Sequence, residues 1–438
     1  MNFRISLSLA ILALVVEVCH ADDPFVASFE ASQNTATCQV SVRYSLSSPA
    51  VVTLNVETNV GDGVWLPFGA IPATETEGDI NRLVSDSDIH TIVWNPGVNR
   101  PWRPIRNGRI RVGIRAWSPT EPPDYMVVDL TRDNVVRYYE SEDAVPFNGG
   151  VTNVLCKTDY LVMRKIHAAG KEFLMGPITN ETGSFEGGAI KAREYPQHPV
   201  AFTSDYYIAI FELTQRQYLN IMRKSASPTN PSAYSGDDRD VHPLESCTAG
   251  SFRGWVRWPE NGLSVGAGSA VWHLRANTGV DTFDAPTEAR WEFAYRAGTC
   301  TELYTGKNVT TSANLECPNA SETAWYWHTS GDGLPTHEVG TRGCNPWGLY
   351  DMGGNVQELC KDRYSTGVAF SDGSYVVDPP GPRADDPAGG VDANSMTRRG
   401  GSITQQARDC RAAARISWNL TESFSNSGFR MCCEAVAK

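Results

Sequence analysis

The chain has 438 residues, of which 20% are charged and 10% are aromatic, and its formal net charge at pH 7 is −12. This length accommodates two domains or more, and the many aromatic side chains exclude an intrinsically disordered protein. The negative charge argues against nucleic acid or an anionic membrane as a partner, because both repel an acidic protein. Composition therefore indicates a globular multidomain protein and leaves its fold open.

The N-terminal segment has the pattern of a secretory signal peptide. Arg4 precedes an apolar run at residues 5–16, and Ala21 stands directly before two aspartates. We predict cleavage after Ala21, so that residues 1–21 are removed and the protein is secreted or reaches the periplasm. A lipoprotein cleaved before Cys19 is an alternative, although a large residue stands where a small one is expected. A membrane anchor needs about 20 apolar residues, so we predict no transmembrane anchor.

The sequence contains 11 cysteines, and removal of the signal peptide takes away Cys19 and leaves ten. An even number of cysteines in an exported chain predicts disulfide bonds. The spacing alone does not give the pairing. Cys317 and Cys344 lie in the same loop-rich section and are one candidate pair. Cys432 and Cys433 are adjacent and need different partners, unless one of them stays free.

Residues 22–135 have the pattern of an all-β sandwich domain. Short runs of alternating apolar and polar residues are separated by turn-forming pieces such as Asn59-Val-Gly-Asp-Gly. Strands at this spacing are typical of immunoglobulin-like and fibronectin-like modules. No chemistry is evident in this part, so we interpret it as an accessory module. The runs that predict strands are residues 39–45, 51–58, 90–94 and 109–117.

A charged segment at residues 136–150 is predicted to be a linker, and a second domain is predicted at residues 151–438. This domain is rich in Gly, Trp, Asn and Pro and has few periodic segments. The apolar spacing predicts helices at residues 214–223 and 287–296, with a weaker helix at 265–274. We therefore expect a loop-rich domain with few regular elements.

The stretch Asn345–Glu358 is the most informative part of this domain. It contains three glycines between large apolar residues, and it presents oxygen atoms from Asp351, Asn355 and Glu358 within one short bend. Apolar anchors on both sides of a glycine turn favour a rigid loop. Carboxylate and amide oxygens are the ligands that calcium prefers. The sequence therefore predicts a loop that holds a hard cation.

Several segments in this domain occur in an order that resembles one known family. They are residues 173–176, 196–200, 207–214, 285–298, 313–315, 345–358, 399–402 and 426–430. In this order they resemble the formylglycine-generating enzymes, also called sulfatase-modifying factors. The resemblance covers some 260 residues, from Phe173 to Cys432. It implies a compact α+β fold related to C-type lectins, which fits the loop-rich composition.

The resemblance also implies two calcium sites. The first would take side-chain oxygens from Asp351 and Glu358 and main-chain carbonyls from Gly354 and Val356. The alternative for the two carboxylates is that they cap turns or pair with arginines. The second, weaker site has a longer spacing than in the enzyme. Its four ligands would be Asn314, Asp332 and the carbonyls of Leu315 and Leu334.

Copper is the cofactor that the resemblance implies for catalysis, and here the match fails. The enzyme oxidises a cysteine of a client sulfatase with a copper ion held by two cysteine thiolates, soft ligands that select copper(I). In this chain Gly400–Ser402 is followed by one cysteine, Cys410, which matches a structural cysteine of the family. We therefore predict no copper site. A second sulfur within bonding reach of Cys410 would restore the copper hypothesis, and a disulfide to a core cysteine would exclude it.

Ser402 matches a polar residue in the family's active cleft and is the one candidate catalytic residue. The alternative is a buried hydroxyl that satisfies a turn. Three arginines beside glycine turns, Arg399, Arg415 and Arg430, could line an anionic pocket or make structural contacts to carbonyls and carboxylates. The histidines show no convincing metal-ligand spacing.

Two hypotheses about function follow. The first is an exported oxidoreductase that acts on a client protein such as a sulfatase, with its chemistry altered or lost. The second is a non-catalytic, lectin-like module that binds a peptide or a glycan. The missing thiolate pair favours the second hypothesis, and the resemblance keeps the first open.

Overall fold

The computed structural model describes residues 23–34, 36–98, 109–132, 135–178, 193–225, 228–310, 315–331, 335–365, 375–383 and 391–438. The predicted signal peptide, residues 1–21, lies outside them. The chain divides into two compact units. The first unit consists of Met1–Val127, Val136–Asn153 and Ala435–Lys438, and the second consists of Val128–Val135 and Val154–Glu434.

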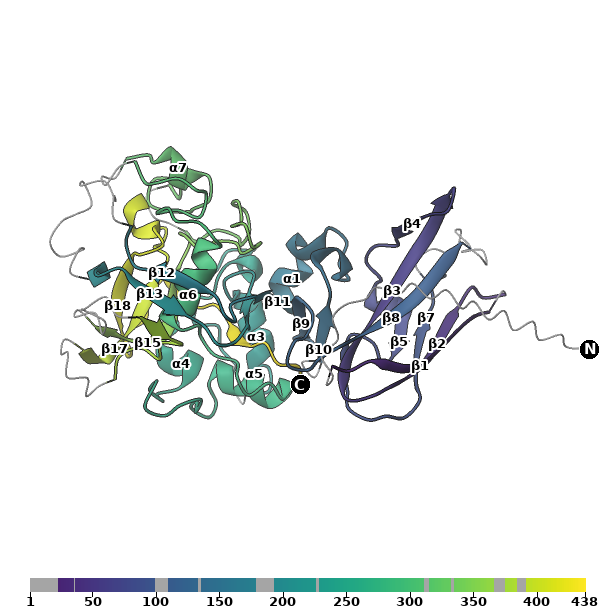
Figure 1. Cartoon of the computed structure of the whole chain (residues 1–438). Helices are drawn as coiled ribbons and strands as arrows, with labels where there is room; N and C mark the ends of the chain where they lie inside the picture. The colour runs from purple at the N-terminus through teal and green to yellow at the C-terminus, as the bar shows by residue number, and fades with distance from the viewer. Residues whose placement is uncertain are drawn as a thin grey trace, which may run out of the picture. The chain divides into compact units, whose positions relative to one another are not determined.

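The first unit is built from two antiparallel sheets. In one sheet the strand order is β1 (Val26–Gln33), β2 (Val40–Leu46), β7 (His90–Trp94) and β5 (Thr76–Gly78). In the other sheet β3 (Ala50–Gly61) lies between β4 (Val64–Pro67) and β6 (Arg82–Val84), and it also pairs along its length with β8 (Ile110–Trp117). Figure 1 shows β3 and β8 as the long strands of this unit. All four predicted strands are present.

Side chains from both sheets share one apolar core. On β2 the residues Val40, Val42 and Tyr44 are buried and alternate with more exposed ones, as a strand with one covered face requires. Ile92 and Trp94 of β7 join the same cluster, together with residues of β3 and, at its margin, β8. The N-terminal region is therefore a β-sandwich.

Residues 136–150, predicted to be a linker, contain regular elements instead. Strand β10 covers Val136–Tyr139, and short 3-10 helices follow at Glu142–Ala144 and Gly150–Thr152. The prediction relied on the charged residues of this segment. Its tyrosines explain the difference, because Tyr138 and Tyr139 are buried, and burial of aromatic surface stabilises an ordered strand.

The second unit has short elements joined by long loops (Figure 1). In the antiparallel sheet β11–β14–β20, β14 is the central strand, and β13 lies between β12 and β16 in another sheet. A third sheet has the order β18–β17–β15–β19. The strands are β9 (Tyr125–Asp129), β11 (Tyr160–Ile166), β12 (Glu172–Met175), β13 (His198–Ala201), β14 (Tyr206–Ala209), β15 (Gln357–Ser365), β16 (Val376–Val377), β17 (Val391–Arg399), β18 (Arg415–Asn419), β19 (Ser427–Gly428) and β20 (Cys432–Glu434).

Two helices of this unit begin where the sequence predicts, whereas the weaker helix predicted at 265–274 is found at Ala270–Thr278. Helix α3 starts after Thr214, whose hydroxyl accepts a bond from the Gln217 amide in a capping box. The α6 helix starts after Thr287, and all of its residues except Arg290 are buried, so it is an internal helix. The helices are α1 (Leu155–Thr158), α3 (Gln215–Met222), α4 (Ala249–Arg253), α5 (Ala270–Thr278), α6 (Glu288–Arg296), α7 (Pro318–Ser321), and the 3-10 helices Arg239–Val241 and Ala407–Cys410.

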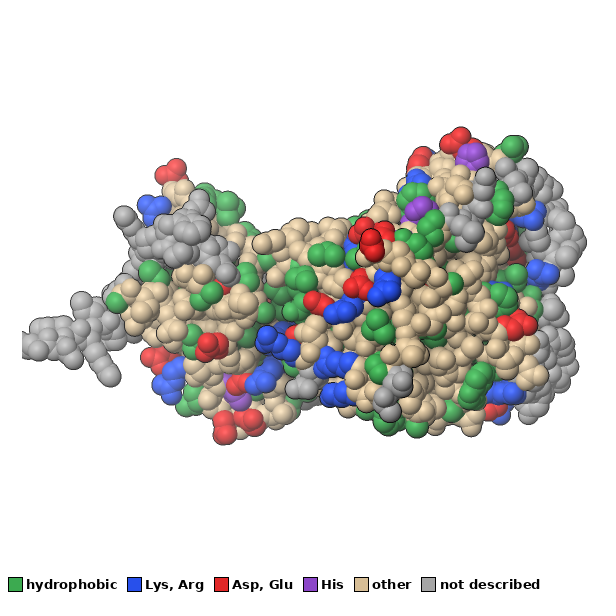
Figure 2. Space-filling view, turned by 180° about the vertical axis from the view of Figure 1, so that it is seen from behind, with side chains coloured by type: hydrophobic (Ala, Val, Ile, Leu, Met, Phe, Trp, Pro, Cys, Tyr) green, Lys and Arg blue, Asp and Glu red, His purple; other side chains and the backbone are tan. Residues whose placement is uncertain are grey.

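On the face shown in Figure 2, most of the surface is neutral or hydrophobic, with acidic and basic side chains scattered over it. Among the residues that the structure describes, none of the helices has the length and apolar character needed to cross a bilayer.

Candidate functional site

The loop Asn345–Glu358 is held rigidly by its own residues and by neighbouring backbone. Asn345 donates its amide to the Ala294 carbonyl at 2.7 Å, and its Oδ1 accepts from two amides of the loop. Gly354 has a φ of +90°, and a Cβ there would lie 2.5 Å from the Trp325 carbonyl oxygen. Only glycine fits this backbone without displacement. The loop is therefore a close-packed support.

The two carboxylates of the first predicted calcium site have different surroundings. Both Glu358 oxygens accept from the Arg430 guanidinium, at 2.6 to 2.9 Å, and Trp291 Nε1 donates to Oε2 at 2.7 Å. Asp351 accepts from the Gly340 amide through Oδ2, and its buried Oδ1 has no partner. Burial raises the pKa of Asp351 to about 6. Of the four carboxylate oxygens of Asp351 and Glu358, only Asp351 Oδ1 therefore remains without a partner and could bind a cation.

A third carboxylate, Glu212, supports the same loop and was not predicted. Its Oε2 accepts from the Asn355 side-chain amide at 2.7 Å, and its Oε1 accepts from the Val356 amide at 3.0 Å. Glu212 is fully buried, and burial raises its pKa well above the usual value. The sequence signal for it was a glutamate inside the otherwise apolar strand segment 207–214.

The structure places only part of the second predicted calcium site. Leu315 is 62% exposed, whereas Asn314, Asp332 and Leu334 lie outside the described residues. Within the described ranges, no group of three or more His, Cys, Asp or Glu side chains is arranged to hold a metal ion. Calcium at either site stays a prediction. At the first site, its binding would require Glu358 to exchange Arg430 for the cation.

Ser402 belongs to a cluster of neutral polar side chains, called here the Ser402 cluster. Its hydroxyl lies 3.2 Å from Thr404 Oγ1 and 3.2 Å from Gln405 Oε1, and it accepts from Asn426 Nδ2 at 3.3 Å. Ser402 is buried, but Thr404 is exposed and the two amide side chains are half-buried. The Ser402 hydroxyl bonds to no histidine or carboxylate in the described chain. The cluster can donate and accept hydrogen bonds, but it lacks the adjacent base that activates a serine nucleophile.

A cavity of about 40 Å³ adjoins this cluster. Gly401 and Gln405 line it, together with Gln357 of β15 and six charged residues, Arg193, Glu194, Arg398, Arg399, Asp409 and Arg415. A second cavity of about 50 Å³ is lined by Met175, Glu288, Asp362 and others. The two cavities share the residues Glu194, Arg399 and Arg415.

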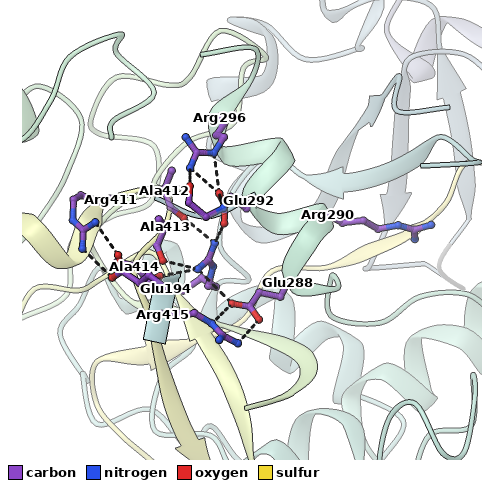
Figure 3. Close-up of polar contacts among 12 residues, drawn as sticks. Glu194, Glu288, Arg290, Glu292, Arg296, Arg411, Ala412, Ala413, Ala414 and Arg415 are labelled. Atoms are coloured by element: carbon purple, nitrogen blue, oxygen red, sulfur yellow. Dashed lines mark hydrogen bonds and ion pairs between the residues drawn. The ribbon is translucent and has the colours of Figure 1, made fainter. Parts of the chain in front are cut away.

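The residues that the cavities share belong to a buried network of arginines and carboxylates (Figure 3). Arg411 pairs with Glu194, Arg415 pairs with Glu288, and Arg399 bonds to Glu292 and to the carbonyls of residues 412–414. Arg290 extends away from this group on α6 and pairs with Glu434.

The three arginines singled out from the sequence all make structural contacts. Arg399, Arg415 and Arg430 each form an ion pair inside the protein, and Arg399 and Arg415 also line the two cavities. Beside them, burial and the charge of Glu288 raise the pKa of Asp362 to about 7. Asp362 was missed because a single aspartate in a strand carries no distinctive signal.

The structure does not show the candidate pair, because Cys317 and Cys344 are not bonded to each other. Disulfide bonds in this chain stay a prediction. Cys317 is buried in an apolar cluster, whereas Cys344 is exposed. Cys410 lies in the same cluster as Cys317, and burial raises its thiol pKa. Cys410 forms no disulfide bond in the structure, and the absence of a copper site stays a prediction.

Comparison with known proteins identifies relatives of the second unit. The family described as "Sulfatase-modifying factor enzyme 1-like domain" matches residues 164–435. The chaperone protein LppX of Paenibacillus barcinonensis is 29% identical over 223 residues, which are 43% of this chain and 73% of that protein. The formylglycine-generating enzyme of Streptomyces coelicolor is 34% identical over 155 residues, 34% of this chain and 46% of the enzyme. This chain thus spans less than half the length of that enzyme.

Solved structures include similar chains at lower identity. PvdO from Pseudomonas aeruginosa is 19% identical, with 63% of this chain and 94% of that chain covered and a TM-score of 0.47. Treponema denticola variable protein 1 is 24% identical, with coverages of 63% and 95% and a TM-score of 0.45. The matched family segment makes up more than half of the sequence and coincides with the loop-rich unit. The chain therefore belongs to the sulfatase-modifying factor family, whose α+β, lectin-like domain here follows a β-rich N-terminal region.

Proposed function

We propose that this chain is an exported binding protein, which uses the Ser402 cluster to recognise a polypeptide segment and does not oxidise it with copper. The observation that carries the proposal is the chemistry of the cluster. Ser402, Thr404, Gln405 and Asn426 present neutral donors and acceptors beside a cavity of about 40 Å³. Groups of this kind suit peptide N–H and C=O groups, which need a partner of each sort.

The cysteine chemistry supports the same proposal. Copper(I) in this family requires thiolates, and Cys410 is fully buried with a raised thiol pKa, so its protonated form is favoured. The Ser402 hydroxyl in turn has only neutral partners. The cluster is therefore equipped for recognition.

The relatives support a polypeptide ligand in preference to a glycan. One relative is named a chaperone and another is named a formylglycine-generating enzyme, and the family implies protein clients such as sulfatases. Export follows from the signal-peptide pattern at residues 1–21. Calcium bound at Asp351 would stabilise the loop Asn345–Glu358, which supports the fold around the site.

The test is co-expression with a sulfatase that carries the cysteine motif modified by this family. We expect the sulfatase to be captured by the chain and to keep its thiol mass. Replacement of Thr404 and Asn426 by alanine should weaken capture about ten-fold, because two hydrogen-bonding side chains at the surface of the cluster are lost. Ser423→Ala, which changes an exposed hydroxyl in the same unit, is the matched control.

Two outcomes would overturn this proposal. A client mass that shows conversion of the thiol to an aldehyde would establish oxidation. Capture of a neutral oligosaccharide, with no capture of the sulfatase, would establish a glycan-binding module.

A further inference from the structure

A small cavity in the second unit is lined by four cationic side chains and by no carboxylate. It has a volume of about 10 Å³, about the space one water molecule requires. It shares no lining residue with the two cavities beside the arginine network. The residues that line it are Arg253, Gly254, Trp255, Val256, Arg257, Trp258, Lys361, Arg363, Ser395, Met396 and Leu420.

Lys361 is the central residue of this cavity. It lies on β15, only 7% of it is exposed, and its Nζ lies 3.8 Å from the centre of the Trp258 ring. Among the described residues, its ammonium has no hydrogen bond and no carboxylate within 4 Å. Burial lowers its pKa, as expected for a lysine removed from water. The aromatic ring offsets only part of the cost of burying this charge.

Arg253 supplies a second donor without a partner. Its Nε donates to the Asp284 carboxylate at 2.8 Å, and its Nη1 donates to the Val256 carbonyl. Its Nη2 is buried and has no acceptor in the described part of the chain. Arg253 is itself only 1% exposed. An unsatisfied buried N–H group costs about 1 to 3 kcal/mol, more when it is charged, so an acceptor in this cavity would be stabilising.

The remaining charges around the cavity do not balance these cations. Asp284 is shared between Arg253 and Arg275, and Glu260 pairs with Arg363. Arg257 bonds to the neutral Asn394 amide at 3.0 Å. No carboxylate is among the residues that line the cavity. The cavity therefore has a net positive lining.

The loop that carries Arg253 and Trp255 is tightly constrained. Cβ atoms at Gly254 and Gly266 would each lie less than 3 Å from the other residue's Cα atom, so the two backbones touch. The Trp255 ring lies against Gly250, where a Cβ would come within 2.3 Å of it. Trp255 is nevertheless 60% exposed. A fixed, exposed indole beside a cationic cavity is a preformed feature of a binding site.

We propose that this cavity binds a single carboxylate group, held by Lys361 and Arg253 and carried by a ligand that packs an apolar or aromatic group on Trp255. The cavity has room for about one water-sized group, so one carboxylate oxygen enters it and the rest of the ligand lies outside it. A carboxylate accepts from both cations, whereas a neutral group would leave the ammonium uncompensated. The site is separate from the Ser402 cluster and does not depend on the function proposed for that cluster.

The test uses isothermal titration calorimetry of the whole chain with three small probes. N-acetyl-phenylalanine combines a ring with a carboxylate, its amide has the ring alone, and acetate has the carboxylate alone. We expect the acid to bind at least ten-fold more tightly than the amide. Acetate binding as tightly as the acid would identify a free small carboxylate as the ligand. Weak acetate binding would identify a carboxylate at the end or side chain of a larger molecule.

The variant Lys361→Met separates a ligand-holding lysine from a structural one. It keeps the length of the side chain and removes the charge, so the folded chain should keep its melting temperature while binding of the acid falls at least ten-fold. Lys307→Met is the matched control, because Lys307 is an exposed lysine paired with Glu322. Equal binding of the acid and the amide would overturn the proposal, and so would unchanged binding of the acid by Lys361→Met. A loss of unfolding free energy in Lys361→Met as large as its loss of binding free energy would overturn it as well.

Discussion

The two units of this protein are stabilised in different ways. In the first unit, the core consists of apolar side chains such as Val42, Ile92 and Trp94. Its Arg111–Glu57 ion pair is part-exposed, with side chains 32% and 24% accessible. The second unit contains several ion pairs that are buried, and the side chains of Arg430 and Glu358 are both 0% exposed.

The loop-rich fold of the second unit explains this difference. Loops inside a protein have carbonyl groups without sheet partners, and buried polar groups need hydrogen bonds. Arg399 donates to the carbonyls of residues 412–414, and Arg430 donates to those of Ala209 and Tyr350. Each guanidinium thus bonds to main-chain carbonyl groups of other segments of the chain. Carboxylates inside the protein then neutralise the arginines.

The largest effect is expected from breaking one buried pair. Arg430→Ala leaves Glu358 charged and without its cation, and this should lower the free energy of unfolding of the second unit by about 3 to 5 kcal/mol. Chemical denaturation followed by tryptophan fluorescence measures it. Arg111→Ala, in the part-exposed pair of the first unit, should cost less than about 1 kcal/mol. Similar costs for the two variants would contradict the distinction between the units.

The apolar core of the first unit gives the next largest effect. Ile92→Ala removes buried methyl and methylene groups and should cost about 2 to 5 kcal/mol, depending on how far the core relaxes. The loss should appear in the unfolding of the first unit, with the second unit unchanged. Thr91→Ala, an exposed position on the same strand, is the control. Calorimetry of both variants would show whether the two units unfold independently.

Stability of the second unit should depend on pH through Asp362. The pKa of Asp362 is raised to about 7 in the folded protein. At a pH between the ordinary aspartate pKa and 7, the folded state therefore keeps a proton on Asp362 that the unfolded state has lost. Stability therefore falls as pH rises towards 7, by roughly 2 to 3 kcal/mol between pH 5 and pH 7. Asp362→Asn mimics the protonated form and should flatten this dependence. An unchanged slope in Asp362→Asn, or the same flattening in the exposed control Asp88→Asn, would refute it.

The smallest effect concerns calcium at the loop Asn345–Glu358. If Asp351 binds calcium, a concentration ten times the Kd stabilises the chain by about 1.4 kcal/mol. Asp351→Asn should abolish this increment and leave the melting temperature in chelator unchanged or higher, because a raised pKa means that the buried charge is costly. If the wild-type chain has the same melting temperature in calcium and in chelator, the prediction of a calcium site at Asp351 is wrong.

The sequence predicted the parts of the fold that depend on periodicity and capping. The alternating run at residues 39–45 became β2, and Thr214 and Thr287 cap the two helices expected after them. The ordered segments also identified the family. Residues 136–150 were misjudged because their charged residues obscured the buried Tyr138 and Tyr139.

The site was less predictable, because its contacts join residues far apart in the chain. Glu212 supports Asn355 across 143 positions, and Glu358 meets Arg430 across 72. A carboxylate can serve either as a calcium ligand or as the partner of a buried arginine. Only the three-dimensional arrangement distinguishes these two roles. The pairing of cysteines was not predictable for a related reason, since the number of cysteines does not show that Cys317 is buried and Cys344 is exposed.

Copper binding tests the central claim, that this family member lacks the thiolate pair needed for client oxidation. The purified chain is titrated with copper(I) against a colorimetric chelator, with Cys410→Ser as the variant. We predict that the chain does not compete with the chelator at one equivalent and that Cys410→Ser behaves like the wild type. Tight binding of one copper(I) ion that is lost in Cys410→Ser would contradict the claim and restore the oxidoreductase hypothesis.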